Sequence, residues 1–587
     1  MKIFKNLLFL LTPQELKSAG LLLIMIIIMA LLDVIGVASI LPFMAVLTNP
    51  NLIETNLILN SFFKSLSIFG VENNNQFLFA LGVIVFVLLV ISLVFKSITI
   101  YLQAYFSKMC EYSISKRLIE KYLHQPYSWS LNRHSSELGT TILSEVNRVI
   151  GSGLSPMIEV ISRLLVTIGL VILIIVANPK LALIISVSLG VAYGLIFYFV
   201  RKYLAKIGKQ TQKNNQLRFL SVNDAFSAIK EIKTGGLEQI FIKQFSKPAK
   251  TFAKNETIIQ AISQIPRYIL EIVAFGGILL MLLYMISQTN DLSKVLPIIT
   301  LYVFAGYRLM PSVQQIYHSF TNIVFIGPSL EKLCNDLKNL KLIDNNQNKE
   351  KLLFEKKISL KKIYYNYPNA SQTSLSNINL TIPAKSTVGI IGTTGSGKTT
   401  MIDIILGLLE PQKGTLEIDD KIITKKNMRS WQRSIGYVPQ NIYLIDDTIA
   451  ANIAFGVEAG TINQKLVENA AKTANLHEFV INELPEKYET TIGERGVRLS
   501  GGQRQRIGLA RALYHKPQVV IMDEATSALD YQTEEIVMDA IKLLGKNTTI
   551  ILIAHRLNTL KHCNIIYKLD KGELVDQGTF DELINNK

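Results

Sequence analysis

Cysteine is scarce in this 587-residue chain, and acidic side chains are outnumbered by basic ones. The three cysteines, Cys110, Cys334 and Cys563, lie far apart and form neither a disulfide framework nor the spacing of a metal site. We expect them to be apolar core residues in a reducing compartment. The net charge of +16 comes from Lys and Arg spread through loops, not gathered with aromatic residues into one patch, which disfavours nucleic-acid binding.

Apolar residues are abundant instead: they make up 49% of the chain, and the mean hydropathy is +0.30. Such a composition indicates membrane helices. In the first apolar run Asp33 is the only charge, and the run is long enough to cross a bilayer as a helix. The basic and apolar segment before it is closer to an interfacial helix than to a cleaved signal peptide. Six spans are predicted, at about residues 20–47, 77–106, 155–177, 181–200, 267–287 and 294–326.

The loops between these spans differ in charge. Residues 201–266 carry about a dozen cations, whereas residues 48–76 hold only Lys64. Because cytoplasmic loops are enriched in Lys and Arg, both termini are expected in the cytoplasm and the protein in the cell inner (plasma) membrane. Residues 57–69 have apolar positions at helical spacing, which fits a short helix on the outer surface or a loop packed on the helix ends.

The pattern changes after the last span. Residues 334–357 are polar and fit a linker, and residues 358–587 alternate short strands with helices, as in a soluble α/β domain. We therefore predict an all-α, six-helix transmembrane domain in residues 1–333, followed by an α/β domain in residues 358–587.

A phosphate-binding loop identifies that domain. Residues 392–399 read GTTGSGKT, match G-x-x-x-x-G-K-[ST] and stand between an apolar strand and a helix. Its glycines let backbone N–H groups face phosphates, Lys398 is suited to the β- and γ-phosphates of ATP, and Thr399 to Mg²⁺. The predicted nucleotide-binding residues here are Gly392, Thr393, Thr394, Gly395, Ser396, Gly397, Lys398, Thr399 and Thr400. The α/β domain is therefore predicted to be a P-loop NTPase domain.

Further polar residues follow other strands of this domain. An apolar strand ends in Asp523 and Glu524, where Asp523 can hold Mg²⁺ and Glu524 can polarise the attacking water. Another strand ends at His555, which can donate to the γ-phosphate. Gln440 can bind Mg²⁺ and sense the γ-phosphate. Tyr367 can stack on adenine, or it can be a core aromatic residue.

A second anion-binding helix start is formed by Ser500, Gly501, Gly502 and Gln503, in the sequence LSGGQ. A single ATP does not need two such sites on one face of one domain. The more economical interpretation is that this helix start binds ATP held by another copy of the chain, which predicts a homodimer.

Together these motifs resemble those of the ATP-binding cassette (ABC) transporters, over nearly the whole chain. The resemblance rests on residues 392–400, Gln440, residues 499–503, residues 521–524, residues 527–530 and His555. It implies an exporter-type half-transporter that hydrolyses ATP with Mg²⁺ in two shared sites. A nucleotide-gated channel or sensor is the alternative from another class, and the intact Glu524 and His555 argue against it.

Within that family the membrane half looks most like bacterial lipid-linked oligosaccharide flippases. In that resemblance Lys96, Arg267 and Arg308 are the cavity cations that serve the pyrophosphate of the cargo, while Gln315 stands where a further cation is expected. The alternatives are that these cations snorkel or pair with Asp33 and Glu271, and that the cargo is another lipid, a drug or a peptide.

Overall fold

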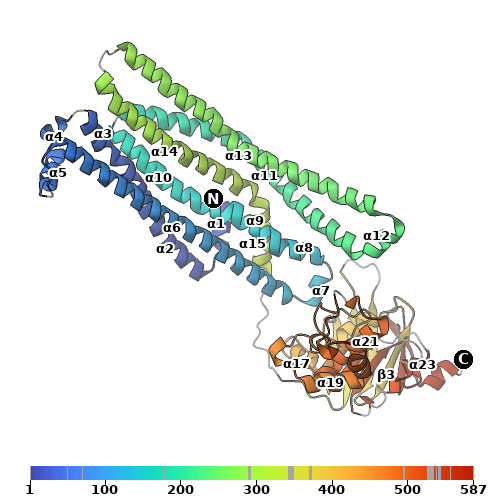
Figure 1. Ribbon diagram of the computed structural model, residues 1–587. Helices are drawn as coiled ribbons and strands as arrows, with labels where there is room; N and C mark the ends of the chain where they lie inside the picture. The colour runs from blue at the N-terminus through green and yellow to red at the C-terminus, as the bar shows by residue number, and fades with distance from the viewer. Residues whose placement is uncertain are drawn as a thin grey trace. The chain divides into compact units, whose positions relative to one another are not determined.

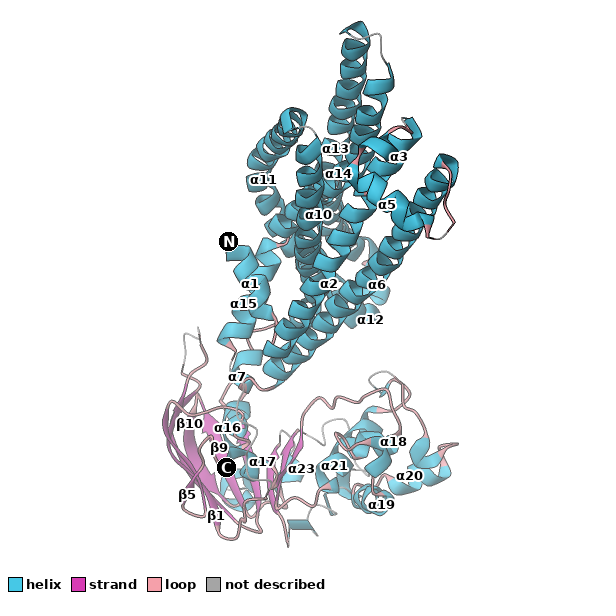
Figure 2. Ribbon diagram, turned by 90° about the vertical axis from the view of Figure 1, so that its left-hand side faces the viewer, coloured by secondary structure: helices cyan, strands magenta, loops and turns pink. Residues whose placement is uncertain are grey.

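The computed structural model describes residues 2–48, 50–68, 70–177, 179–288, 292–340, 350–368, 373–493, 496–524, 534–536, 538–539, 544–545, 547–554 and 557–585. The chain divides into two compact units. One comprises Met1–Gln125 and Leu131–Leu342, and the other Pro126–Ser130 and Ile343–Lys587. The first unit is helical, and the second is built on β-sheets (Figure 1 and Figure 2).

Long helices form the first unit (Figure 1). They are α2 (Pro13–Ala38), α6 (Asn74–Leu123), α10 (Ser155–Ala177), α11 (Pro179–Ser227), α13 (Glu238–Gln288) and α14 (Leu292–Phe325). The 50 residues of α6 span about 75 Å at about 1.5 Å each, far more than the ~30 Å apolar layer of a bilayer. Among the described residues, three stretches are long and apolar enough to cross a membrane: Pro13–Leu47, Asn74–Leu123 and Ser135–Leu173.

Local signals set the start and end of the first long helix. The Thr12 hydroxyl accepts from the N–H of Glu15, whose carboxylate accepts from the N–H of Thr12, and Pro13 occupies the first helical turn. The helix ends at Ala38 because Pro42 has no N–H to offer the carbonyl four residues earlier. A short continuation, α3 (Ile40–Thr48), follows.

Two short helices follow α3 in the chain. Residues 57–69, expected to be either a surface helix or a packed loop, contain α5 (Leu57–Ser67), which follows the short α4 (Leu52–Thr55). The Asn56 side chain caps α5 by accepting from two of its N–H groups. The ring of Phe63 lies edge-on to that of Phe77, with centroids 5.3 Å apart, so α5 is both helical and packed on α6.

The end of the first unit is more helical than the sequence indicated. Helix α15 (Gly327–Asn339) extends into the range predicted as linker because Leu330, Leu333 and Leu337 bury one of its faces. The ammonium of Lys121, at the end of α6, donates to the carbonyls of Leu337 and Leu340 and so caps the C-terminal end of α15.

Two sheets form the second unit. A four-stranded antiparallel sheet has the order β2-β1-β4-β5, and a six-stranded sheet has the order β10-β9-β3-β8-β7-β6. Their strands are β1 (Lys357–Tyr365), β2 (Leu375–Pro383), β3 (Thr387–Gly392), β4 (Lys413–Ile418), β5 (Lys421–Ile422), β6 (Ile435–Val438), β7 (Val519–Asp523), β8 (Thr549–Ile553), β9 (Ile565–Asp570) and β10 (Glu573–Gly578). The predicted fold class, an all-α membrane part and an α/β cassette, is confirmed.

Strand direction determines where ligands of the second unit can bind. Strands β3, β6, β7, β8 and β9 are parallel, so their carboxyl ends share one edge of the sheet. Every residue of β7 and β8 is buried, which accounts for their unbroken apolar sequences. Helices α16 (Lys398–Ile405) and α21 (Gly501–Tyr514) complete this unit around its core.

Candidate nucleotide site and intramembrane cavity

The phosphate-binding loop joins β3, which ends at Gly392, to α16, which begins at Lys398. Gly397 caps α16 with φ of 99°, and a Cβ at this position would lie 2.7 Å from the carbonyl oxygen of Ser374. Only glycine fits both constraints. The loop therefore brings backbone N–H groups and the start of α16 to the ligand edge of the sheet.

Two side chains of the loop fit a phosphate group. Lys398 is buried, and its ammonium donates to the carbonyls of Gly392 and Thr393 at 2.8 and 2.9 Å. Burial lowers the pKa of Lys398, opposed by the carboxylates of Glu524 and Asp523. The hydroxyl of Ser396 is buried and has no hydrogen-bond partner among the described residues. An anion in the loop would satisfy both donors.

Gln440 and Glu524 meet at the same edge. Glu524 follows β7 with a φ of 49°, unusual for a side chain of this size, and its N–H donates to the carbonyl of Ile553. The amide of Gln440, just after β6, donates to the Glu524 carboxylate at 2.7 Å. The residue before Glu524, Asp523, is buried at the end of β7. Two separate sequence motifs are thereby joined by one hydrogen bond.

Tyr367 occupies a position intermediate between its two predicted roles. Its ring is half-buried and lies edge-on to Tyr365, with centroids 5.2 Å apart. A hydrogen bond of 3.3 Å joins its hydroxyl to the Thr400 hydroxyl on α16. The ring packs against the cassette core, and its partly exposed surface is compatible with stacking on a base.

The second anion-binding helix start is well formed. Ser500 caps α21: its hydroxyl accepts from the N–H of Gln503, and the Gln503 side chain accepts from the N–H of Ser500. Gly501 and Gly502 form the first turn without side chains that would shield its N–H groups. His555 lies outside the described residues, as do residues 525–533.

Two of the three predicted membrane cations have carboxylate partners. Lys96 on α6 pairs with Asp33 on α2 at 3.1 Å, and Ser92 also donates to Asp33. Arg267 on α13 pairs with Glu271 at 2.6 Å. The pairing that the sequence left open therefore exists for both. Arg308 lies on α14, but its side chain is outside what the structure describes.

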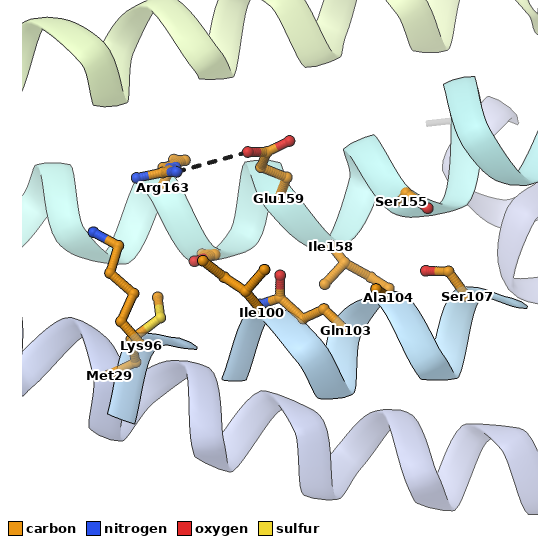
Figure 3. A pocket seen from close by; sticks show the side chains of 11 residues that line it. Met29, Lys96, Ile100, Gln103, Ala104, Ser107, Ser155, Ile158, Glu159 and Arg163 are labelled. Carbon is orange, nitrogen blue, oxygen red and sulfur yellow. Dashed lines mark ion pairs between the residues drawn. The ribbon is translucent and has the colours of Figure 1, made fainter. Parts of the chain in front are cut away.

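A cavity of about 280 Å³ lies between α2, α6 and α10 (Figure 3). Lys96 and Arg163 lie at the same end of it, and Arg163 pairs with Glu159, one turn away on α10, at 3.7 Å. It is lined by Met29, Lys96, Ile100, Gln103, Ala104, Ser107, Ser155, Ile158, Glu159, Ser162 and Arg163. Arg163 and Glu159 were not among the residues selected from the sequence. Their spacing of four, at the start of an apolar run, was the available signal.

A helical unit with membrane-crossing stretches, joined to a P-loop unit with a second anion-binding helix start, defines an ATP-driven membrane transporter. Residues 40–312 match the ABC transporter transmembrane region, and residues 375–527 match the ABC transporter family. The chain belongs to the ABC transporters. It is a membrane protein and an ATPase coupled to transport, as its motifs predicted.

Its relatives include named flippases. The chain is 30% identical over 479 residues to the ATP-dependent lipid A-core flippase of Wigglesworthia glossinidia brevipalpis, covering 81% of each chain. It is 29% identical over 488 residues to the heterocyst differentiation ATP-binding protein HepA of Nostoc sp., covering 81% of this chain and 77% of that protein. A bacterial Atm1-family ABC exporter with ATP bound has the same fold, with a TM-score of 0.77, 20% identity, and coverage of 96% of this chain and 95% of that one.

Proposed function

We propose that the protein is an ATP-driven flippase for an anionic glycolipid, most simply a lipid-linked oligosaccharide, and that it works as a homodimer by alternating access. One observation carries the proposal: a cavity lined by the charged side chains of Lys96, Glu159 and Arg163 lies between helices that contain stretches apolar enough to cross a membrane. Charges at such depth are costly and usually mark a transport pathway. Relatives named as lipid A-core flippases support a lipid cargo.

The cassette has the groups that phosphoryl transfer requires. Lys398 and the loop N–H groups bind the phosphates, and Thr399, Gln440 and Asp523 would hold Mg²⁺, which neutralises charge on the transferred phosphoryl group when bound. Glu524 accepts the proton of the attacking water, and its bond from Gln440 orients the carboxylate before the nucleotide arrives. We also assign the γ-phosphate contact to His555.

The homodimer follows from the second helix start. Ser500 and the first N–H groups of α21 are suited to an anion. We assign them to the γ-phosphate of ATP held by the partner subunit, so that ATP joins two cassettes and hydrolysis releases them. This arrangement couples the cassettes to alternating exposure of the membrane cavity. The proposed orientation places both termini in the cytoplasm of a cell whose inner membrane holds the dimer.

The three cations predicted from the sequence are proposed to make the surface that faces the cargo positively charged. Lys96 lines the cavity, and Arg267 and Arg308 lie on α13 and α14. We assign all three to the field that favours a pyrophosphate-bearing headgroup. Gln315, which replaces a further expected cation, instead donates to Glu159 at 2.8 Å. A general exporter of lipids, drugs or peptides remains the second candidate, because paired cations also suit a cavity for amphiphiles of other charge.

Reconstitution tests the proposal. Purified protein in liposomes should move a pyrophosphate-linked glycolipid across the bilayer only with ATP, and Glu524→Gln should bind ATP but move none. Separate Lys96→Ala, Arg267→Ala and Arg308→Ala variants should each reduce the flipping rate. If all three flip the lipid at the parent rate, the glycolipid assignment fails and the general exporter is the better conclusion. If the protein hydrolyses ATP at steady state but moves no lipid across the bilayer, a channel or sensor would be the better conclusion.

A further inference from the structure

We propose that Arg163, rather than Lys96, is the residue that contacts the phosphate of the cargo headgroup. In this proposal Arg163 leaves its ion pair with Glu159 when the phosphate binds, and Glu159 keeps its hydrogen bond from Gln315. This inference rests on the proposed transport of an anionic lipid and assigns the direct contact within its cavity. It concerns the end of the cavity where Lys96 and Arg163 lie together (Figure 3).

The ion pair of Lys96 is too well held to be given up. Asp33 is only 5% exposed and accepts both from Lys96, at 3.1 Å, and from Ser92, at 3.3 Å. If an anion drew Lys96 away, a short ion pair would be broken at a carboxylate that is almost fully buried, which is unfavourable. Lys96 therefore contributes positive charge to the cavity wall while staying bound to α2.

The ion pair between Arg163 and Glu159 is looser, and Glu159 has a second hydrogen-bond donor. The guanidinium lies 3.7 Å from the Glu159 carboxylate, longer than a hydrogen bond, and the two side chains are 26% and 34% exposed. The other oxygen of that carboxylate accepts from the Gln315 amide on α14 at 2.8 Å. When Arg163 turns to an anion, Glu159 thus keeps a hydrogen-bond donor, and part of its side chain stays exposed.

The chemistry of the cavity fits a phosphate. Guanidinium binds phosphate oxygens through two parallel N–H groups, which an ammonium cannot do. Ser107, Ser155, Ser162 and Gln103 line the same space. Their hydroxyl and amide groups are hydrogen-bond donors of the kind that the remaining phosphate oxygens need. A volume of about 280 Å³ is at the lower end for small-molecule pockets, so it holds the charged part of a headgroup and not a whole glycolipid.

Binding of defined lipids to the full-length protein in nanodiscs tests this assignment. The probes are phosphatidic acid, which carries a phosphate monoester, an undecaprenyl pyrophosphate, and the uncharged monogalactosyl diacylglycerol. We expect Arg163→Gln to weaken binding of both phosphate lipids about tenfold, about 1.4 kcal/mol, and to leave the uncharged lipid unchanged. Response to one phosphate lipid alone would identify which of the two phosphate chemistries the cavity takes.

Three further variants keep the test decisive. Arg163→Lys should restore only part of the affinity, because its single ammonium lacks the paired N–H groups. Glu159→Gln should strengthen phosphate binding, a gain that misfolding cannot produce. Lys116→Gln removes the cation of another pair with the same i,i+4 spacing, Lys116 and Glu120 on α6 outside the cavity lining, and should change nothing.

Equal loss for the phosphate and uncharged lipids, or no loss with Arg163→Gln, would overturn the inference and leave the pair as a helix-stabilising contact. Because binding is measured without ATP, an absence of flipping by the parent protein would refute the proposed function alone. Arg163-dependent phosphate binding would then still support the assignment of the contact.

Discussion

Asp403 offers a prediction whose size can be worked from the structure. It lies on α16, one turn after the phosphate-binding loop, and only 8% of it is exposed. Burial, and secondly the Asp523 carboxylate, raise the pKa of Asp403 from its ordinary value of 3.8 to about 6. An acid whose pKa is raised by folding destabilises the fold when it is ionised, so Asp403→Asn should stabilise the cassette at neutral pH.

The difference between the two pKa values sets an upper limit for this gain. At about 1.4 kcal/mol per pKa unit, two units correspond to about 3 kcal/mol at pH 7. The penalty in the parent is lost as the pH falls, because the folded state takes up a proton at about 6 and the unfolded state only near 3.8. The advantage of Asp403→Asn should therefore fall to about half by pH 5 and vanish below pH 4.

Thermal unfolding of the full-length protein in detergent, without nucleotide or metal, measures this. For a domain of this size each kcal/mol shifts Tm by about 2–4 °C, so the shift at pH 7 should be several degrees. Asp446→Asn, at an exposed position in the same unit, is the matched control and should show no such shift. A constant offset at every pH, or a lower Tm at pH 7, would refute the reasoning.

Other predictions concern the two sites. Glu524→Gln should retain ATP binding and lose nearly all hydrolysis, since general bases contribute roughly 10²- to 10⁴-fold; a rate above about a tenth of the parent would contradict that role. Mixing Lys398→Ala with Ser500→Arg subunits should restore part of the ATPase activity, because one composite site of each mixed dimer is intact; recovery from strictly monomeric protein would contradict shared sites. Removing Lys96 or Asp33 alone should lower Tm markedly, whereas Lys96→Met with Asp33→Asn should recover most of it; additive losses would contradict a coupled pair.

The nucleotide site was predictable from the sequence because its chemistry is local. The loop from Gly392 to Lys398 is contiguous, and backbone conformation alone forms most of the cradle. The bond between Gln440 and Glu524 was not predictable, since these residues are 84 positions apart and meet only when β6 and β7 pair. Parallel strands bring together side chains that no sequence pattern links.

For the membrane cavity, less could be predicted from the sequence, because its residues come from helices far apart in the chain. The resemblance to flippases selected Lys96 and Arg267, but their partners determine what each can bind, and Asp33 lies 63 positions from Lys96. Arg163 lies inside the predicted span of residues 155–177 but was not selected, because the resemblance to flippases pointed to cations on other helices. Helix α15 was missed for a related reason: polar residues dominate it, and only three leucines on one face make it helical.

Lys398 and Arg163 share one arrangement, in which a weak internal partner holds the cation until its ligand binds. Lys398 donates to two neutral carbonyls, which an arriving phosphate can replace without uncovering a charge. Arg163 faces a carboxylate, so the same exchange would expose Glu159 if Gln315 did not already donate to it. The ion pair of Lys96 differs from that of Arg163 in burial, because only 5% of Asp33 is exposed and drawing the ammonium away would leave that carboxylate little access to water. If the protein moves an anionic lipid as proposed, we expect the ease with which the carboxylate is compensated, more than the presence of a cation, to decide which side chain is available to cargo.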